Sequence, residues 1–307
     1  MGTSYFSVLS LEKLLKNKYN VVGIVTTTDR FSIRKKSIFV ESAVKKYSRL
    51  HALPILQSDD LKYSLFLDTL RKWKTEIIII VAFRMLPKVV WKIPILCSFN
   101  LHPSLLPNYR GSSPIQWVIM NGEHETGLTT FLLNEKVDMG KMLYQKKIFI
   151  EKKENAGSLS IRLAEIGSNL VIDTLNSIIS NCIEPKKQPT NFYFKLAPKF
   201  FRQNSKINCK STIKEIYNKI RGLSPFPGAW CVLTDNFLKK KEFKIYNVEY
   251  ILKKHYQCIG NVLIEKKNMK IAVNEGYLLI LECQLEGKQP MLVKCFMNGK
   301  QNYTMIL

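Results

Sequence analysis

The chain has 307 residues and contains no long uninterrupted run of apolar residues; the longest spans residues 77–83. A helix that crosses a bilayer needs about 20 consecutive apolar residues, so this run is far too short for one. The first residues, Met-Gly-Thr-Ser-Tyr-Phe, lack the basic segment and apolar core of a secretory signal. The sequence therefore predicts a protein without a membrane association.

Clusters of metal-binding residues are also missing. The chain has four histidines and seven cysteines, an odd number, and no two cysteines have Cys-x-x-Cys spacing. Zinc sites and disulfide frameworks need such clusters or pairs. We therefore expect no bound metal, and a reducing, cytoplasmic location in which the cysteines are small core residues. The cysteines are Cys97, Cys182, Cys209, Cys231, Cys258, Cys283 and Cys295, and the histidines are His51, His102, His124 and His255.

Acidic residues are scarce relative to basic ones. The chain has 24 aspartates and glutamates against 47 lysines and arginines, a net charge of +23. Such an excess favours a polyanionic partner, and RNA is the obvious candidate. A second interpretation stays open, because Lys, Ile and Asn are abundant and Gly is scarce, as an AT-rich coding bias would produce.

Strand and helix patterns alternate through the first 180 residues. A chain of this length can bury a large core and suggests two domains. The run at 77–81 is β-branched throughout, as in a strand buried on both faces. The alternation predicts an α/β fold with a doubly wound, mostly parallel sheet. We expect helices at 6–16, 41–51, 64–72, 87–91, 116–121 and 158–179, and strands at 20–25, 53–56, 77–81, 93–101 and 128–133.

The character of the sequence changes near residue 181. Residues 184–198 contain three prolines and several lysines, which indicates a basic linker. A helical pattern at 211–221 then precedes short β-like runs, which predict a small β-barrel. We expect one domain at 1–180 and another at 201–307, joined by a linker at 181–200. The β-like runs are 230–233, 243–248, 260–264, 270–273 and 277–285.

The clearest functional signal lies between residues 99 and 140. Asn100 and His102 are two residues apart at the end of an apolar run, so their side chains share one face of a strand. That face lies at the carboxyl end of the strand, where open α/β sheets place their ligands. Asp138 follows a second strand-like run and could orient the imidazole. A lone Asn-x-His pair is usually structural.

The loop that follows strengthens the functional interpretation. Residues 104–111, Ser-Leu-Leu-Pro-Asn-Tyr-Arg-Gly, contain proline and glycine and cannot form regular structure. They nevertheless carry two leucines, a tyrosine and an arginine, and loops of this kind tend to carry function.

These motifs together resemble the folate-dependent formyltransferases, and within them the members that act on methionyl-tRNA. That family has Asn-x-His, then Ser-Leu-Leu-Pro-x-Tyr-Arg-Gly, then Asp-x-Gly after a strand, all present here in order and at fitting spacing. Further matches are the segments at 114–116, 121–122, 125–127 and 224–230. The resemblance covers nearly the whole chain. It implies a Rossmann-like catalytic domain and a C-terminal barrel of the oligonucleotide-binding type.

The resemblance implies the function and the site residues. The protein would transfer a formyl group from 10-formyltetrahydrofolate to the amino group of methionine on initiator methionyl-tRNA, without a metal and as a monomer. Asn100, His102 and Asp138 would be catalytic. Folate contacts are implied for four loop residues, which are Ser104, Leu105, Leu106 and Pro107. The basic loop at 26–36 would approach the acceptor end of the tRNA.

The chemistry of formyl transfer suits these residue types. The transition state is tetrahedral and carries negative charge on the formyl oxygen, so the site needs hydrogen-bond donors and a route for a proton. Asn100 supplies a donor that does not titrate, and protonated His102 supplies a charged one. Asp138 nearby would favour the imidazolium.

Two other functions stay open at this point. A formyltransferase for a small amine, such as glycinamide ribonucleotide or an amino-sugar nucleotide, would share the same Asn, His and Asp; the basic second domain favours tRNA instead. An RNA-binding protein on a degenerate scaffold would explain the charge, but Asn100, His102 and Asp138 are all intact.

The start of the sequence coincides with the end of the family's first strand. Met1, Gly2 and Thr3 occupy the end of a strand that should lie centrally in the sheet. Without the rest of it, two neighbouring strands would have unpaired backbone groups. We therefore expect the natural chain to begin about six residues earlier, the length of a typical strand, with Met1 as an internal residue.

Overall fold

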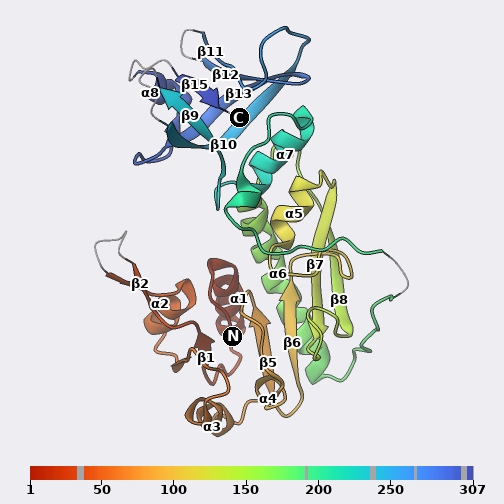
Figure 1. Cartoon of the computed structure of the whole chain (residues 1–307). Helices are drawn as coiled ribbons and strands as arrows, with labels where there is room; N and C mark the ends of the chain where they lie inside the picture. The colour runs from red at the N-terminus through yellow and green to blue at the C-terminus, as the bar shows by residue number, and fades with distance from the viewer. Residues whose placement is uncertain (33–37, 191–192, 236–239, 266–267, 299–302, 307) are drawn as a thin grey trace. The chain divides into compact units, whose positions relative to one another are not determined.

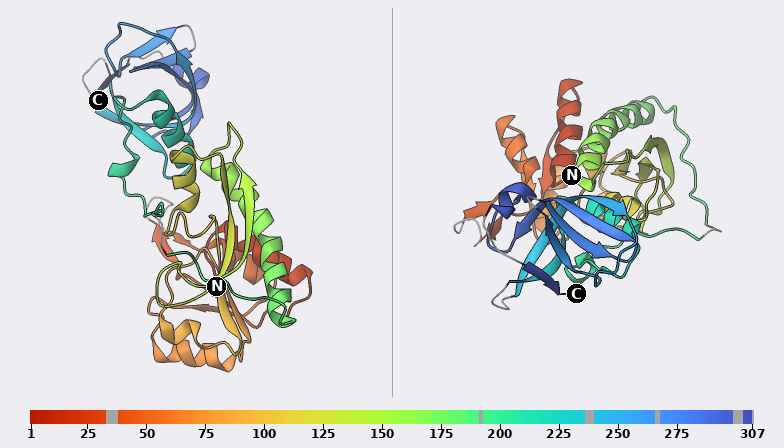
Figure 2. Two further views of the ribbon diagram at one scale, coloured as in Figure 1. Left: turned by 90° about the vertical axis from the view of Figure 1, so that its right-hand side faces the viewer. Right: turned by 90° about the horizontal axis from the view of Figure 1, so that it is seen from above.

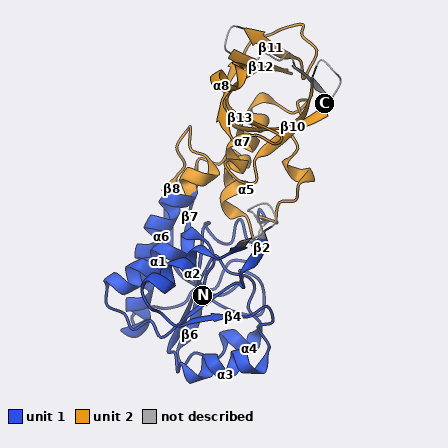
Figure 3. Cartoon of the chain, turned by 90° about the vertical axis from the view of Figure 1, so that its left-hand side faces the viewer, with its two compact units in different colours: residues 1–111, 126–148, 160–196 blue, residues 112–125, 149–159, 197–307 orange. Residues whose placement is uncertain are grey.

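The computed structural model describes residues 1–32, 38–190, 193–235, 240–265, 268–298 and 303–306. The chain divides into two compact units (Figure 3). Unit 1 contains residues 1–111, 126–148 and 160–196, and unit 2 contains residues 112–125, 149–159 and 197–307. Two short internal segments thus belong to the same unit as the C-terminal part of the chain.

Unit 1 is built on parallel strand pairs (Figure 1). β5 (Ile77–Val81) pairs in parallel with β6 (Cys97–His102), and β1 (Ile24–Thr26) pairs in parallel with β4 (Ile55–Gln57). Beyond β6 the sheet continues through β7 (Glu125–Leu132) to β8 (Met142–Phe149). β7 runs antiparallel to β6. The expected α/β fold with a largely parallel N-terminal sheet is confirmed.

Helices connect and cover these strands. The predicted helix at 64–72 and strand at 77–81 match α3 and β5 residue for residue. In α3, Phe66 and Leu70 are one turn apart and pack with Ile78 and Ile80 of β5, as an amphipathic helix on a buried strand should. No helix within the described ranges is both long and apolar enough to cross a membrane. The helices are α1 (Tyr5–Lys16), α2 (Ala43–Leu50), α3 (Ser64–Lys72), α4 (Lys88–Trp91) and α6 (Ala156–Ile179).

Part of the basic segment at 26–36 is a strand rather than a loop. β2 (Arg30–Ser32) pairs antiparallel with β3 (Ile38–Val40). Phe31 and Phe39 face each other across the pair, with ring centroids 5.4 Å apart, and cross-strand aromatic pairs of this kind stabilise hairpins. Residues 33–37 of the expected tRNA loop lie outside the described residues.

Unit 2 contains an antiparallel sheet packed on a helix, as expected for the C-terminal domain. The strand order is β11-β12-β13-β10-β9-β15, and the two end strands approach each other, so the sheet curves round (Figure 2). α7 (Ile213–Leu223) fills the interior with Ile213, Ile216, Ile220 and Leu223. The strands are β9 (Ala229–Asp235), β10 (Lys240–Leu252), β11 (Val262–Glu265), β12 (Asn268–Val273), β13 (Gly276–Leu285), β14 (Met291–Leu292) and β15 (Tyr303–Ile306); the other helices are α5 (Pro114–Met120) and α8 (Val293–Met297).

A glycine inside α7 allows close packing against α5. A Cβ at Gly222 would lie 2.5 Å from the Met120 side chain and 2.9 Å from the backbone oxygen of Gln116. The helix propensity of alanine exceeds that of glycine by about 1 kcal/mol. The clash is with backbone, however, so α5 would have to move.

We expect Gly222→Ala to lower the free energy of unfolding by about 1–3 kcal/mol, because overpacking outweighs the gain in helix propensity. Urea denaturation followed by circular dichroism measures this. Lys214→Ala, at an exposed position of the same helix, should change stability by less than about 0.5 kcal/mol. A Gly222→Ala protein that is more stable than the original would show that α5 and α7 can move apart at little cost, contrary to the prediction.

Candidate active site

The last residues of β6 carry the predicted amide and imidazole. β6 lies between β5 and β7, with Asn100 opposite Ile80 and His102 opposite Thr129. Phe99 and Leu101 point to the other face and are 0% and 1% exposed. Because these two residues are anchored in the core, Asn100 and His102 share the opposite face at the carboxyl end of the strand, as the sequence predicts.

The imidazole of His102 is buried, and its two nitrogens have different surroundings. Nε2 lies 2.9 Å from the backbone oxygen of Tyr109. A carbonyl oxygen can only accept, so Nε2 carries a proton and donates it. Nδ1 lies 3.9 Å from Oδ2 of Asp138, within ion-pair range but too far for a hydrogen bond. The protein thus fixes the tautomer and turns Nδ1 toward a carboxylate.

Asp138 reaches His102 from the loop between β7 and β8. Its backbone has φ +53°, an uncommon conformation for a residue other than glycine. Its Oδ2 accepts a hydrogen bond of 2.8 Å from the backbone N–H of Gly111. One carboxylate oxygen therefore faces both the imidazole and the end of the 104–111 loop, and the structure brings Asp138 to His102 as predicted.

Asn100 differs from its neighbours because its polar group is unused. Its side-chain amide makes no hydrogen bond to any other described residue, although the residue is half-buried. Buried or half-buried polar groups in proteins are normally bonded. An amide held without a partner beside a histidine is suited to donate a hydrogen bond to a bound molecule.

The loop that carries the four predicted folate residues is shaped by partners from β7 and β8. Thr129 donates from Oγ1 to the Ser104 backbone oxygen (2.7 Å) and accepts from the Leu106 N–H (3.2 Å). The Gln145 side chain donates to the Leu106 oxygen at 2.9 Å and to Thr129 Oγ1 at 3.0 Å. The Leu105 oxygen accepts from the Asn108 N–H. Side chains of β7 and β8 thus hold the loop in place by bonding to its backbone groups.

A segment from the linker crosses the end of this loop. The backbone N–H of Tyr109 donates to the oxygen of Lys195 at 2.6 Å, and Arg110 forms a parallel bridge with Leu196. The guanidinium of Arg110 also lies 5.4 Å from the ring centre of Phe194. The described residues 184–190 and 193–196, hereafter the strap, therefore form part of the site.

Gln188 in the strap joins the two loops of the site. Its Oε1 accepts from Arg110 through Nη2 at 2.5 Å and Nε at 3.2 Å, and its Nε2 donates to the backbone oxygens of Asp138 (2.8 Å) and Gly140 (2.9 Å). Gln188 is 7% exposed. Burial lowers the pKa of Arg110 from its ordinary value, and the Asp138 carboxylate acts in the opposite direction. A single buried amide therefore connects Arg110 to the loop that presents Asp138.

Thr129, Gln145 and Gln188 were not expected from the sequence. Thr129 could have been suspected as a polar residue in the apolar run at 128–133. Gln145 lies on β8, a strand that the sequence did not predict because the residues around Gln145 are polar. Gln188 lies in a proline-containing segment where no periodic pattern applies, so no sequence signal identifies it.

Two family models match the chain. The one described as "Formyl transferase" matches residues 1–175, and the one described as "Formyl transferase, C-terminal domain" matches residues 199–301. The first match includes all of the residues around His102 except the strap.

Curated relatives are similar over nearly the full length. A protein named methionyl-tRNA formyltransferase from Flavobacterium johnsoniae is 44% identical over 299 residues, which are 97% of this chain and 94% of that protein. Proteins of the same name from Azobacteroides pseudotrichonymphae and Bacteroides thetaiotaomicron are 42% and 39% identical, with the same shares of both chains covered.

Solved structures of lower identity share the fold. An N-formyltransferase from Helicobacter canadensis has a TM-score of 0.62 at 23% identity, covering 91% of this chain and 96% of that one. HypX from Aquifex aeolicus, solved with tetrahydrofolic acid, has a TM-score of 0.62 at 18% identity, covering 90% of this chain and 46% of that one. At these identities the likeness shows the fold alone.

We expect Gln188→Ala to loosen the site, because it leaves the buried oxygens of Asp138 and Gly140 without a donor. The free energy of unfolding should fall by about 1–3 kcal/mol, and the Gly111 amide should exchange faster with deuterium. Lys187→Ala, an exposed neighbour in the strap, is the matched control. Equal exchange at Gly111 in the two variants would mean that the strap does not hold the Asp138 loop.

Proposed function

The chain belongs to the formyltransferase family, and from this premise we propose that it transfers a formyl group from 10-formyltetrahydrofolate to the amino group of methionine on initiator methionyl-tRNA. The similarity to proteins named methionyl-tRNA formyltransferase, over 97% of the chain, supports this substrate. The observation that carries the proposal is the pairing of an unbonded Asn100 amide with His102, whose Nδ1 faces Asp138.

The proposed catalytic roles follow from the hydrogen bonds of the three side chains. Asn100 donates from its amide to the formyl oxygen as negative charge develops there, and Nδ1 of His102 becomes a second donor once it has taken the proton of the attacking amine. The Asp138 carboxylate lies 3.9 Å from Nδ1 and orients the imidazole. The N–H of Gly111 holds the carboxylate in place.

Proton transfer is assigned to the same nitrogen. Nε2 of His102 is occupied by the carbonyl of Tyr109, so Nδ1 is the atom that can take the proton from the attacking amine and pass it to the departing N10 nitrogen of the folate. Asn100 does not titrate at neutral pH and stays a donor throughout. The two residues therefore divide oxyanion stabilisation and proton transfer between them.

We propose that Ser104, Leu105, Leu106 and Pro107 contact the folate. Hydrogen bonds within the protein limit which of their atoms can do so. When bound, the folate supplies the formyl group. The Leu106 N–H donates to Thr129. The oxygens of Ser104, Leu105 and Leu106 each accept one bond, from Thr129, Asn108 and Gln145 in that order. Their contributions to a ligand include the second lone pairs of these oxygens and the apolar surfaces of Leu105 and Pro107.

The tRNA is assigned mainly to the C-terminal residues. From residue 201 onward the chain has 18 basic and 8 acidic residues, a surplus of ten. Within unit 2, Arg202 and Lys206 lie 5.2 Å and 6.0 Å from the ring centre of Trp230. Cations around an aromatic ring suit a phosphate backbone with exposed bases. We propose catalysis for residues 1–180, tRNA binding for 201–307, a linker at 181–200, and a cytoplasmic monomer.

Replacing either donor should slow the reaction. We expect His102→Ala and Asn100→Ala to lower the single-turnover rate by roughly a hundredfold or more, because each removes a donor from the developing oxyanion, while tRNA affinity is retained. The assay uses 10-formyltetrahydrofolate with methionyl-tRNA, and His51→Ala, an exposed histidine, is the control.

The same assay tests the substrate. Formylation of glycinamide ribonucleotide, an amino-sugar nucleotide or free methionine at a rate that matches methionyl-tRNA would overturn the proposed function. Near-normal rates in both alanine variants would overturn the assigned residues instead.

Binding of tRNA should weaken steeply with salt. Each phosphate contact contributes a slope of about −0.9 to log K against log salt concentration. We expect the double variant Arg202→Gln, Lys206→Gln to reduce that slope by up to about 2, and Lys72→Gln, an exposed lysine of α3, to leave it unchanged. If the unsubstituted protein, the double variant and Lys72→Gln all gave the same slope, the cations around Trp230 would not contact phosphate.

A further inference from the structure

One lysine of α2 contacts both ends of the strand pair formed by β2 and β3. Asp29 immediately precedes β2, and Glu41 immediately follows β3. Nζ of Lys45 lies 2.5 Å from Oδ2 of Asp29 and 3.8 Å from Oε1 of Glu41. A single cation therefore joins the two points at which the chain enters and leaves this strand pair.

Further contacts hold the two carboxylates in place. The Gln57 side chain, at the end of β4, donates from Nε2 to Oδ1 of Asp29 at 3.1 Å. Glu41 accepts a hydrogen bond of 2.7 Å from Nη1 of Arg49. The side chains of Lys45, Asp29 and Glu41 are 18%, 24% and 23% exposed, so solvent screens their attraction only in part. Hydrogen bonds from Lys45 and Gln57 lower the pKa of Asp29 below its ordinary value, which keeps the carboxylate charged at neutral pH.

The helix that carries the lysine is anchored to β1. Ser42 caps α2 by accepting a bond of 3.0 Å from the Lys45 N–H, and its Oγ lies 2.8 Å from Oγ1 of Thr26 in β1. A cap of this kind stabilises the first turn of a helix. Val44 packs with Ile24 of β1 in a buried cluster. The ion pairs of Lys45 therefore position the β2–β3 pair relative to β1.

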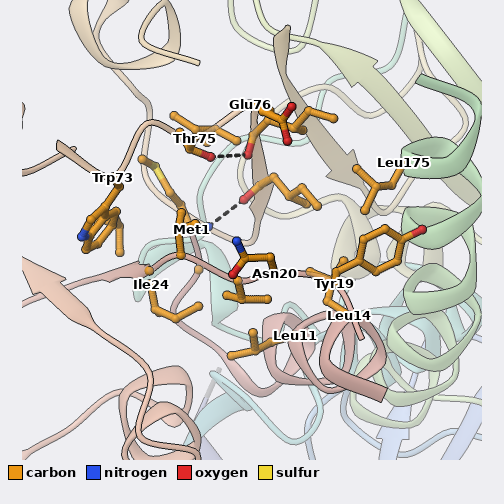
Figure 4. Close-up of a pocket in the computed structure, with 18 of the residues that line it drawn as sticks. Met1, Leu11, Leu14, Tyr19, Asn20, Ile24, Trp73, Thr75, Glu76 and Leu175 are labelled. Atoms are coloured by element: carbon orange, nitrogen blue, oxygen red, sulfur yellow. Dashed lines mark hydrogen bonds between the residues drawn. The ribbon is translucent and has the colours of Figure 1, made fainter. Parts of the chain in front are cut away.

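Loops at the carboxyl ends of the strands connect this arrangement to the candidate active site. A cavity of about 680 Å³, with Trp73 on its wall, separates β1 from β5 (Figure 4). Polar contacts nevertheless join the loops that follow β1, β4 and β5. Thr28 donates to the Asp59 carboxylate at 2.5 Å, and Arg84 donates to the backbone oxygens of Ser58 and Asp59. Because β5 pairs with β6, these contacts continue to the strand that carries the site.

The β2–β3 pair presents two aromatic side chains to solvent. Phe31 and Phe39 are 55% and 64% exposed, although their rings contact each other edge to face. Arg30, next to them in the chain, is exposed as well. Proteins bind single-stranded nucleic acid with aromatic rings that stack on bases and with cations that contact phosphates. The surface of this strand pair therefore suits unpaired nucleotides of a tRNA.

We propose that Lys45 is a positioning residue for tRNA binding, and that it holds the β2–β3 pair so that Phe31 and Phe39 meet the tRNA in a fixed orientation. This inference rests on the proposed function. A surface that is ordered before binding gives a higher affinity, because less conformational entropy is lost when the complex forms. Lys45 acts through the strand pair, since two carboxylates already engage its Nζ.

The test replaces Lys45 by methionine, which keeps a long unbranched side chain and removes the cation. We expect Lys45→Met to raise the Kd for methionyl-tRNA about tenfold and to speed deuterium exchange at the amides of residues 30–32 and 38–40. The single-turnover rate at saturating tRNA and the Kd for folate should stay within about twofold of the original values. Lys45→Arg, which retains the cation, should restore most of the tRNA affinity.

Lys46→Met is the matched control, because it removes an exposed lysine from the same helix and changes the net charge equally. A Kd for Lys45→Met no larger than that for Lys46→Met would overturn the proposal. So would weaker tRNA binding by Lys45→Met with unchanged exchange in β2 and β3, because Lys45 would then contact the tRNA itself. Failure of the proposed function is seen separately, as absence of methionyl-tRNA binding by the unsubstituted protein.

A double-mutant cycle tests whether Lys45 acts through the aromatic pair. Phe31→Ala should raise the Kd for methionyl-tRNA about fivefold or more in the unsubstituted protein, because it removes a stacking surface. In the Lys45→Met protein the same substitution should raise the Kd by less than about twofold, since the strand pair is no longer held in position. Equal effects of Phe31→Ala in the two proteins would overturn the coupling between Lys45 and the strand pair.

Discussion

The hydrogen bond from Nε2 of His102 to the backbone oxygen of Tyr109 is the contact on which the site depends. It joins the end of β6 to the far end of the loop at 104–111, seven residues later in the chain. Tyr109 has φ +62°, and its own N–H is held by Lys195 of the strap. The orientation of the imidazole therefore depends on a strand, a loop and the linker together.

Most other polar groups around His102 are bonded within the protein. Thr129, Gln145 and Gln188 each satisfy two or more backbone or side-chain groups of the loops that surround the imidazole. Buried polar networks of this kind hold one geometry because each missing bond would cost free energy. Against this background the amide of Asn100 stands out, because it makes no hydrogen bond to any other described residue. In the function that we propose, it donates to the formyl oxygen.

Strong local patterns were sufficient to predict the strands and helices that position the site. The β-branched run of β5 and the apolar periodicity of α3 gave their bounds correctly, and the two-residue spacing of Asn100 and His102 gave their common face. β8 was missed, because Gln145, Lys146 and Lys147 interrupt its apolar pattern. The contacts of Gln188 with Arg110 and Asp138 span 78 and 50 residues, and no local propensity encodes contacts at that separation. The partners of a buried hydrogen bond are set by the tertiary fold.

The burial of Nε2 of His102 has a consequence for the proton transfer that we propose. In many histidine relays a proton arrives at one ring nitrogen and leaves from the other. Here the outer neighbour of Nε2 is a peptide carbonyl, which does not take up a proton at neutral pH, and the residue is only 4% exposed. In the reaction that we propose, a proton therefore enters and leaves through Nδ1, on the side that faces Asp138. Exchange of that proton with water then follows the same path as the reacting molecules.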